Sequence, residues 1–86
     1  RSRYYVRFSV ADRPGVLAKI ADVLGRHQIS IASVFQPKEH PGEIVPLVML
    51  FYRAREQNLR DALEEIARLP SNHGDPVALR MEDFDK

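Results

Sequence analysis

One short stretch of this sequence combines residue types that can hold a charged small molecule: residues 12–17, Asp-Arg-Pro-Gly-Val-Leu. The Pro-Gly pair predicts a turn from a strand into a helix, with proline at the first helical position, where its missing N–H costs nothing. The N–H groups of Gly15, Val16 and Leu17 then lack partners within the helix, and with the positive end of the helix dipole they attract a carboxylate. Gly15 has no Cβ and lets a ligand approach the backbone, and Asp12 offers a partner for an ammonium group. An amino acid would pair its carboxylate with these amides and its ammonium group with Asp12. Alternatively, Asp12 only caps the helix and the free N–H groups form hydrogen bonds with water.

A second stretch, Ile-Ser-Ile-Ala-Ser at residues 29–33, is made of small side chains that alternate with isoleucine. Ser30, Ala32 and Ser33 leave room for a close neighbour, and the two hydroxyls can form hydrogen bonds. The same composition suits an edge strand that fits against a partner strand. The two interpretations are compatible, because a ligand could lie at such a seam.

The residue types needed for catalysis or metal binding are scarce or scattered. The sequence contains no cysteine, no serine in a G-x-S-x-G context and no glycine-rich phosphate loop. His27, His40 and His73 lie at a helix end and in two loops, without a second ligand at helical spacing. We therefore expect neither a catalytic site nor a metal site in this chain, and no nucleotide-binding loop.

The first half of the chain predicts a strand, a helix and a second strand. Residues 3–10 alternate, which places four apolar side chains on one face of a strand: Tyr4, Val6, Phe8 and Val10. Apolar residues at helical spacing follow, at Leu17, Ile20, Ala21 and Leu24. We expect this helix to end at Gly25 or just after it. Residues 29–36 then predict the second strand.

The second half predicts a strand, a helix and a last strand. Residues 44–53 are apolar on both faces, as in a central strand, with Pro46 at its frayed start because proline cannot donate to the ladder. A charged loop, residues 38–40, precedes this strand. The clearest helical stripe comes next and is closed by Pro70: Leu59, Ala62, Leu63, Ile66 and Leu69. After a turn at residues 71–76, alternation over residues 77–82 predicts the last strand.

This order predicts an α+β fold, a ferredoxin-like βαββαβ sandwich with a four-stranded antiparallel sheet and two helices on one face. The other face then carries Tyr5 and one apolar row of the third strand, either Leu47, Met49 and Phe51 or Val48, Leu50 and Tyr52. An apolar patch of this kind usually marks contact with another subunit or domain.

Length and composition agree with one small domain over residues 1–86. An 86-residue chain buries about 64% of its unfolded surface, enough for one core. Its 44% hydrophobic and 29% charged residues are typical of a globular protein. A net charge of +1 gives no reason to expect nucleic acid, and no apolar run is long enough to cross a membrane. We expect a cytoplasmic domain that is a fragment of a longer enzyme.

The two stretches also resemble a known family. A strand ending in Val-Ala-Asp-Arg-Pro-Gly-Val-Leu (residues 10–17), a helix, and then Ile-Ser-Ile-Ala-Ser-Val (residues 29–34) is similar to the ACT domain. The continuation to Gln36 and the segment 45–48, Val-Pro-Leu-Val, resemble the C-terminal ACT domain of bacterial homoserine dehydrogenase.

The resemblance implies a regulatory domain without its own chemistry. Homoserine dehydrogenases are NAD(P)-dependent oxidoreductases of threonine biosynthesis that reduce aspartate semialdehyde to homoserine, and their ACT domain is associated with allosteric feedback inhibition by threonine. ACT domains commonly pair into an eight-stranded sheet, and the effector binds near that seam. The implied effector-binding residues are Asp12, Gly15, Val16, Leu17, Ser30, Ala32 and Ser33. Serine-binding relatives carry Asn at the positions of Asp12 and Ser30, so the effector's identity does not carry over from them.

Three other interpretations remain. The chain could be the ACT domain of another enzyme of amino-acid metabolism, or a module that keeps only the pairing function and has lost its ligand. RNA-recognition motifs share the βαββαβ order, but the third strand lacks their basic and aromatic signature.

Overall fold

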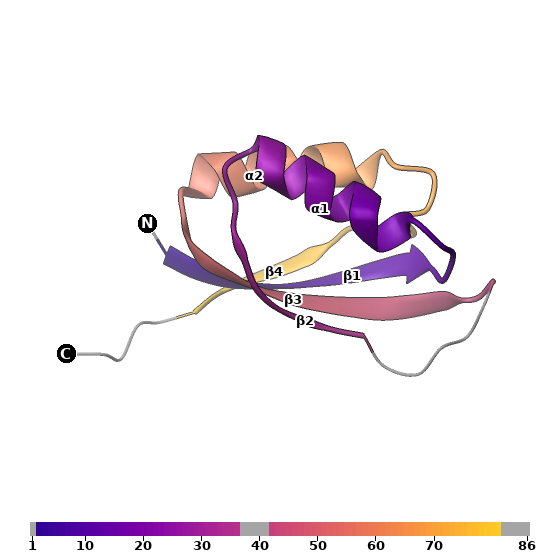
Figure 1. The fold of residues 1–86 in the computed structure, drawn as a ribbon. Coiled ribbons are helices and arrows are strands. Elements are labelled where there is room, and N and C mark those ends of the chain that lie inside the picture. Colours follow the sequence, from indigo (N-terminus) through magenta and orange to yellow (C-terminus); the bar gives the residue numbers. More distant parts are fainter. Residues whose placement is uncertain (1, 37–41, 82–86) are drawn as a thin grey trace.

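Two helices and four strands make up the computed structural model, which describes residues 2–36 and 42–81 (Figure 1). They follow the predicted order: β1 (Ser2–Ala11), α1 (Val16–Arg26), β2 (Ile31–Phe35), β3 (Ile44–Ala54), α2 (Glu56–Ala67) and β4 (Val77–Met81). The loop expected at residues 38–40, with His40, and the end of the last predicted strand at Glu82 lie outside the described residues.

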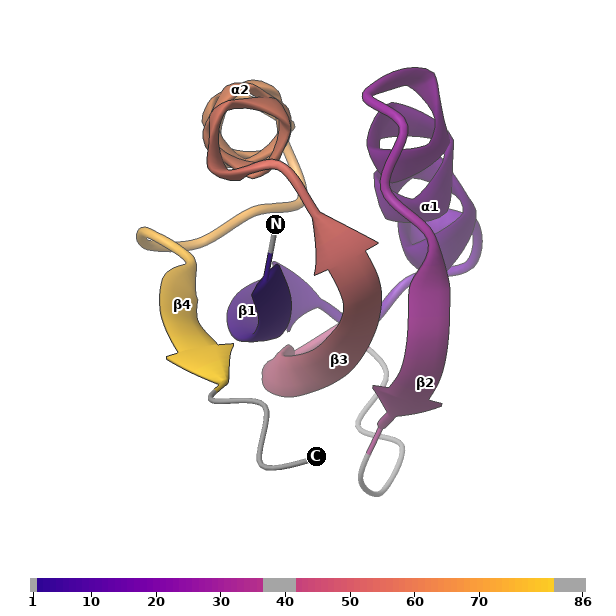
Figure 2. The same cartoon turned by 90° about the vertical axis from the view of Figure 1, so that its left-hand side faces the viewer.

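The four strands form one antiparallel sheet in the order β2-β3-β1-β4. Both helices lie on the same face of this sheet, α1 on the β2 side and α2 on the β4 side (Figure 2). The predicted ferredoxin-like sandwich is confirmed. β2 and β4 are the two edge strands, and β3 is central, as its apolar character on both faces indicates.

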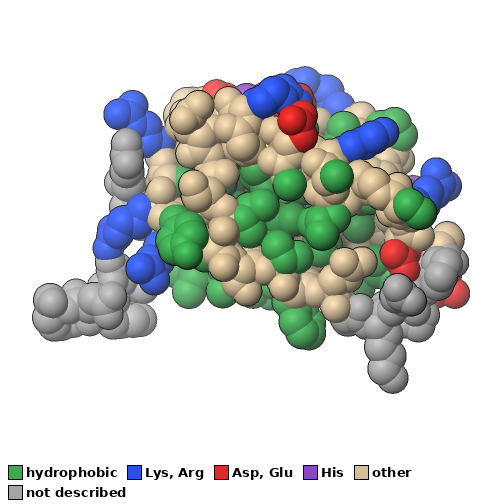
Figure 3. All heavy atoms as spheres, in the orientation of Figure 1, with side chains coloured by type: hydrophobic (Ala, Val, Ile, Leu, Met, Phe, Trp, Pro, Cys, Tyr) green, Lys and Arg blue, Asp and Glu red, His purple; other side chains and the backbone are tan. Residues whose placement is uncertain are grey.

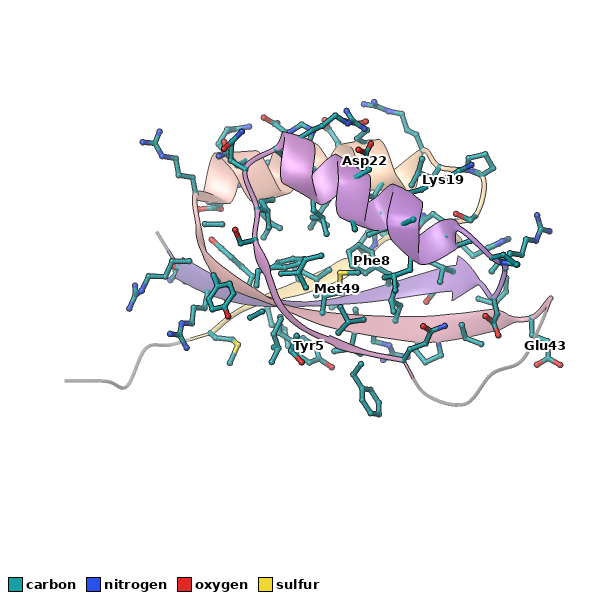
Figure 4. All side chains as sticks on the ribbon, in the orientation of Figure 1. Tyr5, Phe8, Lys19, Asp22, Glu43 and Met49 are labelled. Atoms are coloured by element: carbon teal, nitrogen blue, oxygen red, sulfur yellow. The ribbon has the colours of Figure 1, made fainter. Side chains whose placement is uncertain are left out.

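The core lies between the sheet and the helices, where Figure 4 shows Phe8 and Met49. The four alternating residues of β1 are all buried there, as predicted: Tyr4, Val6, Phe8 and Val10. Antiparallel pairing of Phe8 with Leu47 and of Val6 with Met49 places the odd-numbered residues of β3 on this inner face. The outer apolar row of β3 is therefore Val48, Leu50 and Tyr52, which decides between the two rows left open by the sequence.

The start of the first helix differs from the prediction. Gly15 is the N-cap residue, in a left-handed conformation with φ of 86°, so Pro14 lies outside the helix. Leu17, expected on the buried stripe, is 39% exposed. The buried residues are Val16, Ile20, Val23 and Leu24. This set has equally good helical spacing, and the sequence period alone did not distinguish the two.

The second strand is shorter than predicted, because residues 27–29 still form hydrogen bonds with the last turn of α1. The helix ends just after Gly25, as expected, and the amide of Ile29 donates to the carbonyl of Leu24 at 3.0 Å. Pro46 is not at a frayed start, since it lies inside β3 opposite Ser9. The described part of β2 pairs with β3 only from Val48 to Phe51, so Pro46 lies beyond this pairing, where a missing donor is tolerated.

Gln28 connects α1 to β2 with a φ of 65°, in the left-handed region that favours glycine. This conformation costs an L-residue roughly 1–2 kcal/mol, part of which is offset in glycine by its larger loss of chain entropy. We expect Gln28→Gly to stabilise the fold by about 0.5–1 kcal/mol in denaturant unfolding. A glycine placed inside a helix, Arg60→Gly in α2, is the control and should destabilise the fold by about 1 kcal/mol. A Gln28→Gly loss comparable to that of the control would contradict this assignment.

Candidate functional site

The turn between β1 and α1 forms an open helix N-terminus. Asp12 is fixed by its backbone: its amide donates to the carbonyl of Glu43 at 2.8 Å, and its carbonyl accepts from the amide of Gly42 at 3.0 Å. Gly15, not Asp12, is the N-cap residue of α1 and has no side chain with which to cap it. An added Cβ at Gly15 would meet nothing within 4 Å, so the space in front of the helix is open.

The predicted donors at this terminus are not equivalent. The amide of Val16 donates to the carbonyl of Arg13, which lies before the helix, at 3.3 Å, and the Val16 side chain belongs to the core. The described residues provide no backbone acceptor for the amides of Gly15 and Leu17. Of the three predicted donors, these two remain for an anion.

A shallow cleft of about 130 Å³ opens beside this terminus. Its lining adds residues that were not predicted to belong to the site: Arg13, Lys19, Pro70 and Ser71. Ser71 is held there because its carbonyl accepts from the amide of Ala11 at 2.9 Å. Lys19 follows Gly15 by one helical turn and could have been found from that spacing, whereas the contact of residues 70–71 had no local signal. Two cationic side chains beside free amides make this cleft suitable for a carboxylate.

The second predicted group lies at the other end of the sheet. The carbonyl of Ser30 accepts from the amide of Tyr52, whereas Asp12 is bonded to Glu43, just before β3. A strand rises about 3.3 Å per residue, so these two positions on the β3 segment are roughly 30 Å apart. Within one chain the structure therefore does not bring Ser30 together with Asp12 and Gly15.

The side of the molecule formed by α1 and β2 carries exposed apolar side chains. Figure 3 faces this side and shows hydrophobic side chains gathered in its middle. Leu17 on α1 is 39% exposed and Val34 on β2 is 41% exposed. The pairing of β2 with β3 shifts between Ile31 and Ser33, at Ala32, so the small residues lie at an irregular edge strand.

An ion-pair network joins the end of α1 to α2. Glu65 accepts from Arg26 at 2.7 Å, and its other oxygen lies 2.9 Å from Nε2 of His27. The hydrogen bonds of His27 and Arg26 hold the pKa of the Glu65 carboxyl below its usual value. This network fixes the two helices against each other, away from the helix N-terminus described above.

The lowered pKa of Glu65 predicts a pH-dependent contribution to stability. A carboxylate with a depressed folded-state pKa stabilises the fold above its unfolded pKa, and this contribution is lost as the pH falls through the folded value. We expect Glu65→Gln to lower the melting temperature at neutral pH, by an amount that shrinks toward zero in the acidic range below about pH 4. Glu64→Gln is the control, because Glu64 and Arg68 form only an exposed pair at 3.8 Å. A pH-independent difference between Glu65→Gln and the unsubstituted chain would contradict the account.

Other kinds of site find little support in the part of the chain that the structure describes. Across residues 2–36 and 42–81, no three His, Cys, Asp or Glu side chains are grouped so that they could hold a metal ion. No helix among them has the length and hydrophobicity required to span a bilayer. A larger groove of about 500 Å³ lies between α2 and β4, but none of the predicted site residues lines it.

Comparison with known proteins gives one consistent result. The family model of the ACT domain matches residues 4–71. Homoserine dehydrogenase from Methylobacillus glycogenes is 37% identical over 86 residues, and the match covers 99% of this chain and 21% of the relative. Homoserine dehydrogenase from Pseudomonas aeruginosa is 35% identical over 82 residues, and the match covers 94% of this chain and 19% of the relative. The chain thus spans about a fifth of the length of these relatives.

A solved structure supports the same grouping. The crystal structure of a homoserine dehydrogenase from Thiobacillus denitrificans superposes with a TM-score of 0.88 at 32% identity, covering 98% of this chain and 18% of that one. The resemblance to ACT domains of homoserine dehydrogenases, expected from residues 10–17, 29–36 and 45–48, is confirmed over nearly the whole chain.

Proposed function

The chain belongs to the ACT domain family, and from this premise we propose that it is the regulatory domain of a homoserine dehydrogenase, where it pairs with a second copy and binds threonine as a feedback effector. In this proposal the rest of a longer polypeptide binds NAD(P)H and reduces aspartate semialdehyde. Residues 1–86 bind the effector and carry out no chemistry.

The observation that carries this proposal is the separation of the two halves of the site. Asp12 and Gly15 lie at the end of the sheet toward which β2 runs, and Ser30 lies at the end where β2 begins. When two β2 edges pair antiparallel about a two-fold axis, the start of one strand lies beside the end of the other. Pairing therefore brings Ser30 of one copy toward the open helix N-terminus of its partner.

The exposed apolar groups of the α1 and β2 side support the same pairing. Leu17 and Val34 would be buried at the seam, and the small side chains of Ala32 and Ser33 let the two edge strands approach. A β-strand edge without a partner is also the position at which a second copy can extend the sheet.

Threonine fits the groups that this pairing assembles. Its carboxylate would accept from the amides of Gly15 and Leu17, beside Arg13 and Lys19, and its ammonium group would pair with Asp12. The hydroxyls of Ser30 and Ser33 from the second copy suit the threonine hydroxyl. Each contact matches a donor with an acceptor or a cation with an anion.

Titration with threonine tests the function. Calorimetry or NMR on protein shown to be dimeric should detect saturable binding, with shifts centred on residues 12–17. Binding of another amino acid in place of threonine would assign the domain to a different enzyme of amino-acid metabolism. If the dimer shows no response at millimolar concentrations of any amino acid, the domain serves only for pairing, and the proposed sensing role is overturned.

A further inference from the structure

The face of the sheet opposite the helices carries a continuous apolar surface, called here the outer face. Antiparallel register places on it Tyr5 of β1, the row of β3 found above, and alternate residues of both edge strands. Figure 4 shows Tyr5 projecting from the sheet away from the helices. Five of its large apolar side chains are 41% to 63% exposed: Phe35, Tyr52, Val77, Leu79 and Met81. Surfaces of this kind on a small protein mark interaction sites.

The charges of the outer face all have one sign. Arg3 and Arg7 flank Tyr5 on β1, and they pair in register with Met81 and Val77 on β4. None of the outer-face positions on the described strands is an acidic residue. β1 is a central strand, so Arg7 lies within the patch, whereas Arg3 lies near the end of β1 and of the patch.

This charge pattern argues against a second copy as the occupant. Stacking two outer faces about a two-fold axis would bring four arginines into one interface with no described carboxylate to pair with them. Juxtaposed like charges in an interface cost several kcal/mol. The complementary partner has an apolar centre and carboxylates placed opposite Arg3 and Arg7.

The size of the face indicates that the partner is tethered. Four strands spaced about 4.8 Å apart and the stretch from Arg3 to Ser9 give a footprint of about 19 Å by 20 Å, roughly 400 Å² per side. A total near 800 Å² falls short of the roughly 1,200–2,000 Å² of stable complexes between separate proteins. It lies within the roughly 600–1,500 Å² found between domains of one chain, where the linker supplies a high effective concentration.

We propose that the outer face docks onto another domain of the same polypeptide, on an apolar surface whose carboxylates pair with Arg3 and Arg7. The proposal rests on the proposed function, in which the chain is one domain of a longer enzyme; the homoserine dehydrogenases similar to it are about five times longer. Docking through the outer face leaves the β2 edge and the open end of α1 available for pairing and for the effector.

Thiol labelling of the full-length protein tests the docking. The 86 residues contain no cysteine, so a single thiol can be placed by Leu79→Cys on the outer face or by Asp61→Cys on the exposed side of α2. Labelling of the full-length protein without either substitution gives the background rate, which is subtracted. We expect a maleimide to modify the Leu79→Cys thiol at least 10-fold more slowly than the Asp61→Cys thiol in the folded protein, and both equally after unfolding. Equal rates in the folded protein would overturn the proposal.

Charge reversal tests the carboxylates. Adding Arg7→Glu to Leu79→Cys should speed labelling about 10-fold, whereas Arg68→Glu, the same change on the helix side, should not. An unchanged rate with Arg7→Glu would overturn the charge complementarity. Protection that disappears on dilution would assign the face to a second copy, and salt-dependent retention on single-stranded RNA would assign it to nucleic acid through Tyr5 and Tyr52; either result overturns docking within one chain.

The labelling result is independent of the effector. An accessible Leu79→Cys thiol in a full-length enzyme that responds to threonine would overturn the docking and leave the proposed function standing. A protected thiol in an enzyme that does not respond to any amino acid would support the docking and overturn the proposed sensing role.

Discussion

Phe8→Ala is expected to destabilise the domain by about 3–5 kcal/mol, the cost of removing a fully buried aromatic side chain from a packed core. Phe8 has no exposed surface and lies between β1 and the helices, opposite Leu47 of β3. Because a domain of this size has a total stability of only about 5–15 kcal/mol, the variant should melt at least about 15 °C lower or fail to fold. Thermal and urea unfolding of residues 1–86 measure the change.

Phe35→Ala is the matched control for this prediction. Phe35 lies on β2 with 63% of its surface exposed on the outer face. The same substitution there should change the stability of residues 1–86 by no more than about 0.5 kcal/mol. Similar losses for the two phenylalanines would show that the layer between sheet and helices is not the core.

Asp12→Lys is expected to weaken threonine binding by roughly 100-fold or more, because it replaces the partner of the ammonium group by a like charge. The backbone of Asp12 is held by Gly42 and Glu43, so the point from which its side chain projects is set by the fold and not by the ligand. Calorimetric titration measures the affinity. Asp61→Lys makes the same change on the exposed surface of α2 and should bind threonine like the unsubstituted protein.

An Asp12→Lys protein that keeps both its melting temperature and its affinity for threonine would remove Asp12 from the site. A protein that loses both would point to a role in the turn, and Asp12→Asn, which keeps the shape and hydrogen-bonding oxygen, then separates the two roles. This conservative variant should keep the fold and still bind at least about 10-fold more weakly.

The sequence predicted the element order and the fold because the local patterns are strong. The alternation in β1 and the stripe of α2 each indicate one structure and one buried face, and both faces were confirmed. The predicted end of α2 was wrong, because the helix ends at Ala67 and Leu69 packs against the core from beyond it. The predicted start of α1 was wrong for a local reason, because the sequence Pro14-Gly15 is compatible with more than one turn. The left-handed conformation of Gly15 places the first helical residue at Val16.

The remaining differences depend on contacts between distant segments. Whether Leu17 or Val16 is buried depends on how α1 sits on the sheet, and the lining of the cleft by Ser71 depends on its bond to Ala11. Neither contact leaves a periodic trace in the sequence. The candidate site was found as two separate stretches for the same reason: one chain holds them at opposite ends of β3, and in the proposed site they meet only when a second copy pairs.

Mixing two inactive variants tests this shared site most directly. Asp12→Lys and Ser30→Trp proteins should each fail to bind threonine alone. A two-fold pair has two equivalent sites, so a mixed pair holds one site with both substitutions and one with neither, and random exchange should restore about a quarter of the sites. Recovery of that fraction in a calorimetric titration is the predicted result. No recovery in a mixture that mass spectrometry shows to contain mixed pairs would contradict a site built from Asp12 of one copy and Ser30 of the other.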